Sequence, residues 1–214
     1  MNMTAGRFLT IEGIEGVGKT TQIARVSAIL AECGIAHVVT REPGGTPLAE
    51  RIRELVLKPG EEPLPAVAEL LLMFAARSVH LANQIEPNLS AGRWVLCDRF
   101  TDATYAYQGA GRRMTGEGIE FLESLVQGTR RPDLTLLLDV PVDVGLQRSR
   151  RRDAGRPADR FELERAEFFE RVREAYLRRA RAEPQRIAVI DAAAPVETVT
   201  SNIAQLLKSK SWIS

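Results

Sequence analysis

The stretch Gly13-Ile14-Glu15-Gly16-Val17-Gly18-Lys19-Thr20 decides the fold, because it matches the phosphate-binding pattern G-x-x-x-x-G-K-[ST] at every fixed position. An apolar run over residues 8–12 precedes it and predicts a strand, and apolar residues at helical spacing over 21–30 predict a helix after it. A strand, a glycine-rich loop and a helix, in this order, present backbone N–H groups to phosphate. The sequence therefore predicts a nucleoside triphosphate site, with Lys19 on the β- and γ-phosphates and the Thr20 hydroxyl on Mg²⁺.

Length and composition are those of a globular protein with one substantial core. With 214 residues and 44% hydrophobic content, we expect one domain over residues 1–214. The 29 basic and 28 acidic residues nearly cancel, so no overall field recruits nucleic acid or an anionic membrane. Cys33 and Cys97 lack metal-ligand spacing and fit a reduced compartment. No apolar run reaches the roughly 18 residues of a membrane span, and residues 1–7 are too short for a signal peptide. We expect a cytoplasmic protein.

Five apolar runs alternate with helical patterns, which predicts a five-stranded, mostly parallel sheet with helices on both faces. The strands are expected at residues 8–12, 35–41, 93–97, 134–138 and 187–191. The helices are expected at 21–30, 48–56, 65–85, 116–127, 142–152, 161–180 and 196–207. In the helix over 65–85 the expected apolar side consists of Val67, Leu70, Leu71, Phe74 and Val79. Residues 105–112 contain two glycines and are expected to form a loop.

Polar residues at strand ends are the first candidates for a site, because ligands of open α/β sheets bind at the carboxyl ends of the strands. Asp98 and Asp139 both end a strand, and either carboxylate is placed to bind Mg²⁺ through water or to take a proton. Periodicity does not choose between them. The adjacent Arg99 favours Asp98, because an acceptor phosphate needs a fixed cation and arginine supplies a bidentate one.

Two further side chains are candidates for base recognition. Arg77 lies in a segment otherwise built for burial, so it either snorkels to the surface or recognises a ligand. Gln108 offers a donor and an acceptor side by side, which suits the edge of a nucleobase, although a lone glutamine is commonly just exposed.

The basic run from Arg148 is the last candidate. It begins in a helical pattern and is then broken by Gly155 and Pro157. Such a run is often only a solvated face. In a phosphate-transfer protein it can also be a lid that delivers arginines to the transferring group, and we place that lid at residues 148–160.

Taken together, these motifs closely resemble bacterial thymidylate kinase. The resemblance rests on T-R-E-P-G-G-T at 40–46, F-A-A-R at 74–77, D-R-F at 98–100 and A-Y-Q-G at 106–109, and it runs from about residue 8 to 207. It implies the P-loop nucleoside monophosphate kinase fold. It further implies transfer of the γ-phosphoryl group of ATP to dTMP with Mg²⁺, giving dTDP for dTTP synthesis, by a cytosolic homodimer.

The resemblance also implies roles for individual residues. The dTMP site would comprise Glu15, Glu42, Pro43, Arg53, Met73, Phe74, Arg77, Arg99, Thr104, Tyr107 and Gln108. Within it, Arg99 would hold the phosphate, Arg77, Thr104 and Gln108 the thymine edge, Glu15 the 3′-hydroxyl, and Tyr107 the space of a ribose 2′-hydroxyl. The ATP site would comprise the loop from Gly13 to Thr20, with Thr21 and with Arg148 near the adenine. Thr20 and Asp98 would hold the metal.

Transfer in such a kinase depends on positioning two anions and neutralising the transition state. The family places an arginine either in the phosphate loop or on the lid. The loop carries Gly16, so this chain resembles the lid-arginine type, with Arg152 as the first choice for the catalytic arginine and Arg156 as the second. An aromatic residue stacks on thymine four positions before the arginine in relatives. Met73 stands at that position here and Phe74 follows it, so either residue is a candidate for packing on the base.

Two alternatives remain open at this point. The first keeps the fold but changes the acceptor to another nucleoside monophosphate or a deoxynucleoside. The second is a P-loop nucleotide switch or a nucleic-acid ATPase. No N-K-x-D stretch is present, and the near-neutral charge gives no nucleic-acid footprint, which disfavours the second alternative. The resemblance implies dTMP and ATP as the partners.

Overall fold

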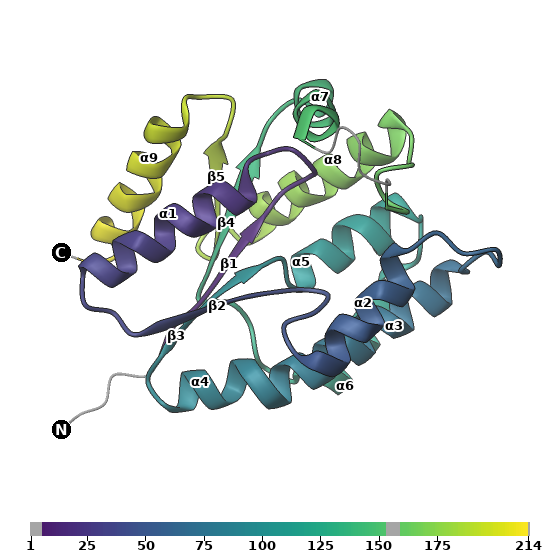
Figure 1. The fold of residues 1–214 in the computed structure, drawn as a ribbon, viewed down its shortest axis with the longest axis horizontal. Coiled ribbons are helices and arrows are strands. Elements are labelled where there is room, and N and C mark those ends of the chain that lie inside the picture. The colour runs from purple at the N-terminus through teal and green to yellow at the C-terminus, as the bar shows by residue number, and fades with distance from the viewer. Residues whose placement is uncertain (1–5, 153–158, 214) are drawn as a thin grey trace.

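The computed structural model describes residues 6–152 and 159–213. Its sheet has five strands in the order β2-β3-β1-β4-β5, and every neighbouring pair is parallel. This order puts the first strand in the centre, as doubly wound α/β sheets do. The strands are β1 (Phe8–Glu12), β2 (His37–Arg41), β3 (Trp94–Asp98), β4 (Leu134–Asp139) and β5 (Ile187–Asp191) (Figure 1).

Helices connect successive strands and cover both faces of the sheet. Their bounds are α1 (Lys19–Glu32), α2 (Pro47–Leu57), α3 (Ala66–His80), α4 (Glu86–Ser90), α5 (Thr101–Thr104), α6 (Gly116–Gln127), α7 (Val142–Arg152), α8 (Ala166–Ala182) and α9 (Val196–Ser209). Two π-helical segments, Leu81–Ile85 and Tyr105–Gly111, continue α3 and α5. The first segment joins α3 to α4 without a break, and the second follows α5 without a break.

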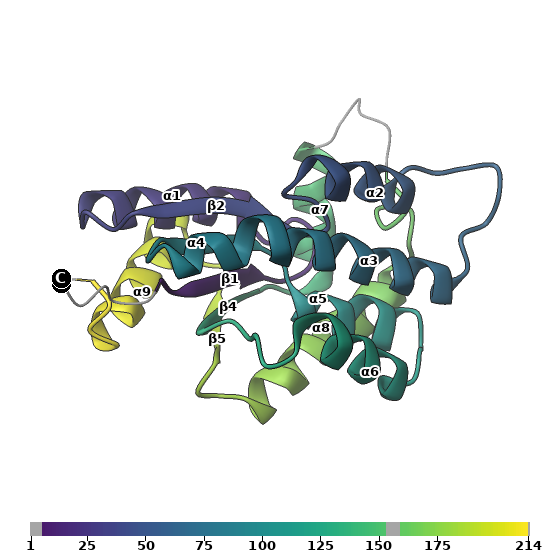
Figure 2. The ribbon, with the colours of Figure 1, turned by 90° about the horizontal axis from the view of Figure 1, so that it is seen from below.

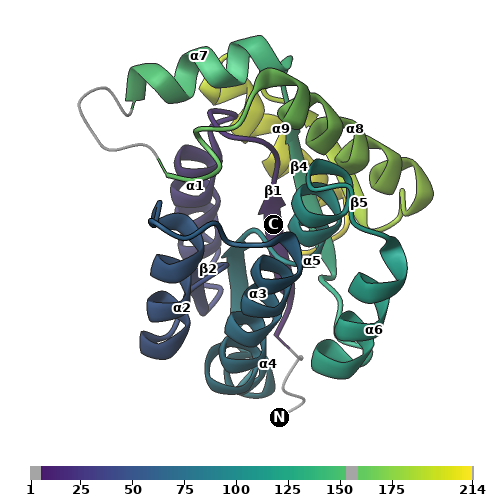
Figure 3. The same cartoon turned by 90° about the vertical axis from the view of Figure 1, so that its right-hand side faces the viewer.

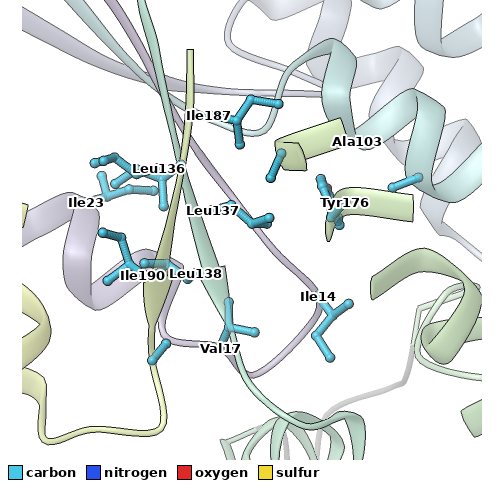
Figure 4. Close-up of a cluster of buried hydrophobic side chains, with 14 of the residues drawn as sticks. Ile14, Val17, Ile23, Ala103, Leu136, Leu137, Leu138, Tyr176, Ile187 and Ile190 are labelled. Carbon is cyan, nitrogen blue, oxygen red and sulfur yellow. The ribbon is translucent and has the colours of Figure 1, made fainter. Parts of the chain in front are cut away.

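The alternation of side chains along the strands sorts the helices into two layers. Leu136 and Leu138 of β4 lie on the side of Ile23 from α1, whereas Leu137 lies on the side of Tyr176 from α8 (Figure 4). Helices α1 and α9 cover the first side, and α4 and α8 cover the second (Figure 1). All of these residues are buried, so the strands are apolar on both faces, as a covered parallel sheet requires.

The helix expected at 65–85 is longer in the structure, and part of its expected apolar side is exposed. Helix α3, the π segment and α4 form one continuous helix that ends at Ser90 (Figure 2). Leu70 and Phe74 are buried as expected, but Val67 and Leu71 are 61% and 52% exposed. The buried side instead includes Glu69 and other polar residues, which a count of apolar spacing cannot place.

The expectation of a loop at 105–112 is wrong, because residues 101–111 are helical. Packing overrides the two glycines here: a Cβ on Gly111 would lie 2.6 Å from the ring of Phe168 in α8, so glycine permits the close approach of the two helices. Helix α8 also begins at Ala166 rather than at 161, since Phe161 lies in a turn.

By length and mean hydropathy alone, the helix Ala66–Ser90 could cross a membrane. It is a core helix of this protein. Three ionisable side chains on it, Glu69, Arg77 and His80, are buried and bonded to side chains of other segments. Polar groups that are removed from water need hydrogen-bond partners, and here other segments of the protein supply them. The helix therefore belongs to a packed protein interior.

Candidate active site

A cavity of about 750 Å³ opens where three adjacent strands end. After β1 the chain enters the loop 13–18, after β2 it reaches Glu42, and after β3 it reaches Arg99. Because β2, β3 and β1 are parallel neighbours, these three segments meet at one edge of the sheet.

The glycines of the loop give it the predicted shape. Gly13, Gly16 and Gly18 all have positive φ, which an L side chain rarely adopts. A Cβ on Gly16 would also collide with the carbonyl group of Gly145 in α7, the helix that crosses above this edge of the sheet (Figure 3). The loop therefore has no room for a side chain at this position.

The side chain of Lys19, the first residue of α1, bonds the loop that precedes it. Its Nζ donates to the carbonyl oxygens of Gly13 and Ile14, at 3.0 and 2.9 Å. Burial, together with the charge of Arg99, lowers the pKa of Lys19 to about 8. A phosphate anion would offer this ammonium group a much better partner than two carbonyl groups do.

Arg99 connects the loop to the rest of the cavity. Its Nη2 donates to Glu15 Oε1 at 2.9 Å, and its Nη1 donates to the Gly13 carbonyl and to the Tyr176 hydroxyl at 2.9 and 3.2 Å. The guanidinium also lies 4.8 Å from the centre of the Tyr107 ring. These contacts fix the direction of the guanidinium before any ligand binds.

Tyr107 completes this cluster. Its hydroxyl donates to both carboxylate oxygens of Glu15, at 2.9 and 2.8 Å. Burial raises the pKa of Tyr107 well above its usual value, so the hydroxyl keeps its proton and remains a donor.

Arg77 is buried and does not snorkel, since only 1% of it is exposed. Its Nε donates to Glu42 Oε2 at 2.7 Å, and its Nη2 donates to Thr104 Oγ1 at 2.9 Å. The other oxygen of Glu42 bonds His80 Nδ1 at 3.0 Å. Among the residues that the structure describes, Arg77 Nη1 has no hydrogen-bond partner although it is buried.

Gln108 presents the complementary atom. Its Nε2 donates to Glu69 Oε1 at 2.8 Å, while its Oε1 is buried and accepts no hydrogen bond from any described residue. Gln108 lines the cavity with an unused acceptor, and Arg77, buried behind the cavity wall, has an unused donor. Buried polar groups are normally paired, so such atoms indicate a ligand.

The two aspartates at strand ends have different surroundings in the structure. Asp139 accepts both hydrogen bonds of the Arg173 guanidinium, at 2.7 and 2.8 Å, and so belongs to a structural pair. Asp98 lines the cavity, and its buried Oδ1 has no partner among the described residues. Thr20 lines the same cavity, and a carboxylate and a hydroxyl supply oxygen donors that suit Mg²⁺.

The structure brings most of the predicted residues to the cavity. Those that line it are Glu15, Gly16, Gly18, Lys19, Thr20, Thr21, Glu42, Pro43, Arg53, Met73, Asp98, Arg99, Tyr107, Gln108, Arg148 and Arg152. Behind its wall lie Gly13, Ile14, Val17, Arg77 and Thr104, all buried. Arg156 lies outside the described residues.

Met73 and Phe74 also lie in different surroundings. Met73 lines the cavity, whereas Phe74 packs with Leu70 and Ile119 in a separate cluster and lies under the Arg77 guanidinium. Of the two candidates for packing on the base, only Met73 is thus among the residues that line the cavity. The helix keeps its register, and the thioether takes the place that faces the cavity.

Six lining residues were not named from the sequence as site residues, although one of them, Asp159, falls within the expected lid. They are Arg41, Leu57, Ala103, Asp159, Phe161 and Glu162. Arg41 ends a strand beside Glu42, so the rule about strand ends could have found it. The others come from helix ends and from the segment after residue 158, where no sequence signal marks them.

Two arginines of α7, Arg148 and Arg152, line the cavity. Arg148 Nη1 donates to the carbonyl of Ala192, in the loop after β5, at 2.9 Å. Arg152 Nη2 bonds Ser149 Oγ at 3.3 Å and lies 3.8 Å from Glu162 Oε1, with its side chain 55% exposed. The exposure leaves Arg152 room to turn toward a bound phosphate.

The fold and the glycine-rich loop after β1 define the class of P-loop nucleoside monophosphate kinases. Residues 11–203 match the family model described as thymidylate kinase. The chain belongs to the thymidylate kinase family and is an ATP-dependent phosphotransferase.

Individual relatives agree over nearly the whole chain. The thymidylate kinase of Pseudomonas entomophila strain L48 is 58% identical over 203 residues, 95% of each chain. That of Chromohalobacter salexigens is 57% identical over 213 residues, 98% of this chain and 100% of the relative. The crystal structure of thymidylate kinase from Ehrlichia chaffeensis superposes with a TM-score of 0.76 at 33% identity, and covers 96% of this chain and 99% of that chain.

Proposed function

We propose that Arg77 and Gln108 recognise the thymine edge of dTMP while this enzyme transfers the γ-phosphoryl group of ATP to it. The products are dTDP and ADP, as family membership implies. The observation that carries the proposal is the unused pair of Arg77 Nη1 and Gln108 Oε1. Thymine offers an acceptor, O4, beside a donor, N3–H, which matches that pair; cytosine offers the opposite order.

The acceptor phosphate is placed on Arg99 in this proposal. Arg99 holds Glu15 in the structure, and a phosphate is a stronger bidentate partner for a guanidinium. Its arrival would release Glu15 to accept from the sugar 3′-hydroxyl. Tyr107 stays bonded to Glu15 and occupies the space beside the sugar, which supports rejection of a ribose 2′-hydroxyl. Glu42, Pro43 and Arg53 complete the acceptor wall, and Met73 packs on the base.

The donor ATP is placed on the loop from Gly13 to Thr20 and on Thr21, with its adenine beside Arg148. The loop N–H groups and the N-terminus of α1 favour the phosphates. The oxygen donors of Thr20 and Asp98 fit Mg²⁺, which would neutralise phosphate charge when bound.

Transfer then depends on this chain's cations. Lys19 faces the donor phosphates, Arg99 fixes the acceptor, and Arg152 on α7 neutralises the charge of the transferring group. We keep residues 148–160 as the lid of one functional unit, residues 1–214. Residues 153–158, including Arg156, lie outside the described part.

The role of Arg152 predicts a specific kinetic change. Arg152→Ala is expected to lower kcat by about 10²-fold or more with the KM for dTMP nearly unchanged, because the lost contact forms mainly in the transition state. Steady-state kinetics with dTMP and ATP measure both parameters. A rise in KM with an unchanged kcat would instead place Arg152 in ground-state binding.

The lowered pKa of Lys19 predicts how ATP binding varies with pH. Below about pH 8 the ammonium is charged and binds phosphate directly; above it, binding must take up a proton. The Kd of ATP is therefore expected to rise by up to about tenfold per pH unit above pH 8. Calorimetric titrations from pH 7 to 9.5 test this, with Lys19→Arg as the variant that stays charged. An equal rise in both proteins would exclude Lys19 as the cause.

We also propose a cytosolic homodimer. Val67 and Leu71 on α3, and Phe121 and Leu125 on α6, are 52–69% exposed, and each pair is one helical turn apart. The two helices pack together, so the pairs lie on adjoining surfaces. Cys33 and Cys97 are unbridged, which suits a reducing compartment.

This surface gives the third prediction. Leu125→Glu is expected to shift the protein from dimer to monomer, because a charge would be buried at the interface. Sedimentation equilibrium measures the mass. Leu163→Glu, which changes an equally exposed leucine in the turn before α8, is the control and is expected to remain dimeric. A wild-type monomer would refute the dimer.

The acceptor assignment is tested by ADP release from ATP·Mg²⁺ with dTMP, dUMP, ribo-TMP, dCMP, AMP and GMP. We expect strong preference for dTMP, with rejection of dCMP by Arg77 and Gln108 and of ribo-TMP by Tyr107. Preference for another monophosphate would show that the base-reading residues are misassigned while the ATP site stands.

A further inference from the structure

Glu69, on α3, is a fully buried carboxylate to which the proposed reaction gives no task. It lies two turns before Arg77 on the same helix. It accepts from Gln108 Nε2 at 2.8 Å, from Arg112 Nε at 3.2 and 3.3 Å, and from Arg160 Nη2 at 3.0 Å. An ionised carboxylate only accepts hydrogen bonds, so every group facing it must be a donor.

This requirement fixes the orientation of the Gln108 amide. With its NH₂ group on Glu69, the carbonyl Oε1 points away and is the buried, unused acceptor described above. The reversed amide would place Oε1 against a carboxylate oxygen and leave the NH₂ group without its partner. Arg77 needs no such control, because every nitrogen of a guanidinium is a donor.

We propose that Glu69 is a positioning residue that holds the acceptor end of Gln108 toward the base and thereby selects nucleobases with an N–H donor at position 3. This inference rests on the proposed function, since it concerns the same base site. Glu69 acts through Gln108 and does not touch the substrate. Arg160 bonds the other carboxylate oxygen and Arg112 bonds both, so two cations balance the charge of Glu69.

A glutamine at position 69 changes the pattern of donors. Its oxygen would turn toward Arg112 and Arg160, and its NH₂ group would face Gln108. Gln108 would then offer its oxygen to residue 69 and its NH₂ group to the base, opposite the N3–H of thymine. The Glu69→Gln variant should therefore lose its preference for an N–H at position 3.

A purely structural role predicts something different. Glu69 also links α3 to the segment around Arg112 and to Arg160, so its loss could simply loosen the site. Loosening would impair all acceptors alike. The discriminating quantity is the ratio of kcat/KM for dTMP to kcat/KM for its 3-deaza analogue, in which C–H replaces N3–H.

The experiment measures that ratio in four proteins. Wild type is expected to prefer dTMP on the order of a hundredfold, and Glu69→Gln to lower the ratio at least about tenfold, with the KM for ATP unchanged. Arg160→Gln removes a cation from Glu69 but leaves the Gln108 contact, so it should keep the wild-type ratio. Glu69→Gln/Arg160→Gln removes one charge of each sign and replaces the single variant should that fail to fold.

The outcomes separate the two proposals. A wild-type ratio near one would refute base recognition by Gln108, and with it the proposed function of this pair. A large wild-type ratio that Glu69→Gln retains would overturn the role of Glu69 alone. A ratio lowered as much by Arg160→Gln would also overturn it, because the amide orientation would not be the cause.

Discussion

Arg99→Met lowers kcat for dTMP phosphorylation by about 10²- to 10³-fold and raises the KM for dTMP on the order of tenfold. Both parameters change because the guanidinium holds the acceptor phosphate in the ground state and keeps it in line during transfer. Arg99 is held in place for both tasks, because it bonds Gly13 and Tyr176 and lies against the Tyr107 ring.

Steady-state kinetics with dTMP and ATP varied separately measure this effect. The matched control is Arg130→Met, which removes a half-exposed arginine paired with Glu86 outside the cavity and should leave both parameters unchanged. The KM for ATP should change little in either variant. Wild-type kinetics in Arg99→Met would remove Arg99 from the site and leave the acceptor phosphate without its proposed partner.

Arg77→Met is expected to lower the free energy of unfolding by about 3–5 kcal/mol and to impair dTMP use. Glu42 is 3% exposed, and without Arg77 its carboxylate keeps, among the described residues, the bond to His80 alone. A buried carboxylate that loses its charged partner costs an amount of this order. The thymine O4 would also lose its donor, so the KM for dTMP should rise.

Urea unfolding and steady-state kinetics measure the two effects, and a second variant separates them. Arg77→Met/Glu42→Gln removes both charges, so it should regain a large part of the lost stability without regaining dTMP recognition. If the double variant recovered both stability and the KM for dTMP, Arg77 would be a structural residue only. An unaltered stability of Arg77→Met would contradict the buried pair itself.

Much of the fold could be predicted from the sequence because its signals are local. The strand over 8–12, the helix over 116–127 and the strand over 187–191 have the expected bounds, since turn residues or glycines limit each of them. The helix at 101–111 could not be predicted, because its glycines permit contact with α8 and that contact is long-range. Strand order is likewise a tertiary property.

The same difference between local signals and long-range contacts applies to the residues of the site. Residues in fixed motifs, such as Lys19 and Arg99, could be named as candidates from the sequence, because the motif itself indicates a phosphate-binding role. Glu69 and His80 were missed, because a buried polar residue on an apolar helix shows its partners only once other segments are in place. The choice between Met73 and Phe74 also required the structure, since adjacent residues on a helix face different sides.

The most direct test of the account is a crystal structure of the enzyme with dTMP. We expect thymine O4 within about 3.2 Å of Arg77 Nη1, N3 within about 3.2 Å of Gln108 Oε1, and the phosphate on Arg99. A thymine ring that turns another edge to Arg77 and Gln108, or a phosphate bound away from Arg99, would contradict the proposed recognition of dTMP.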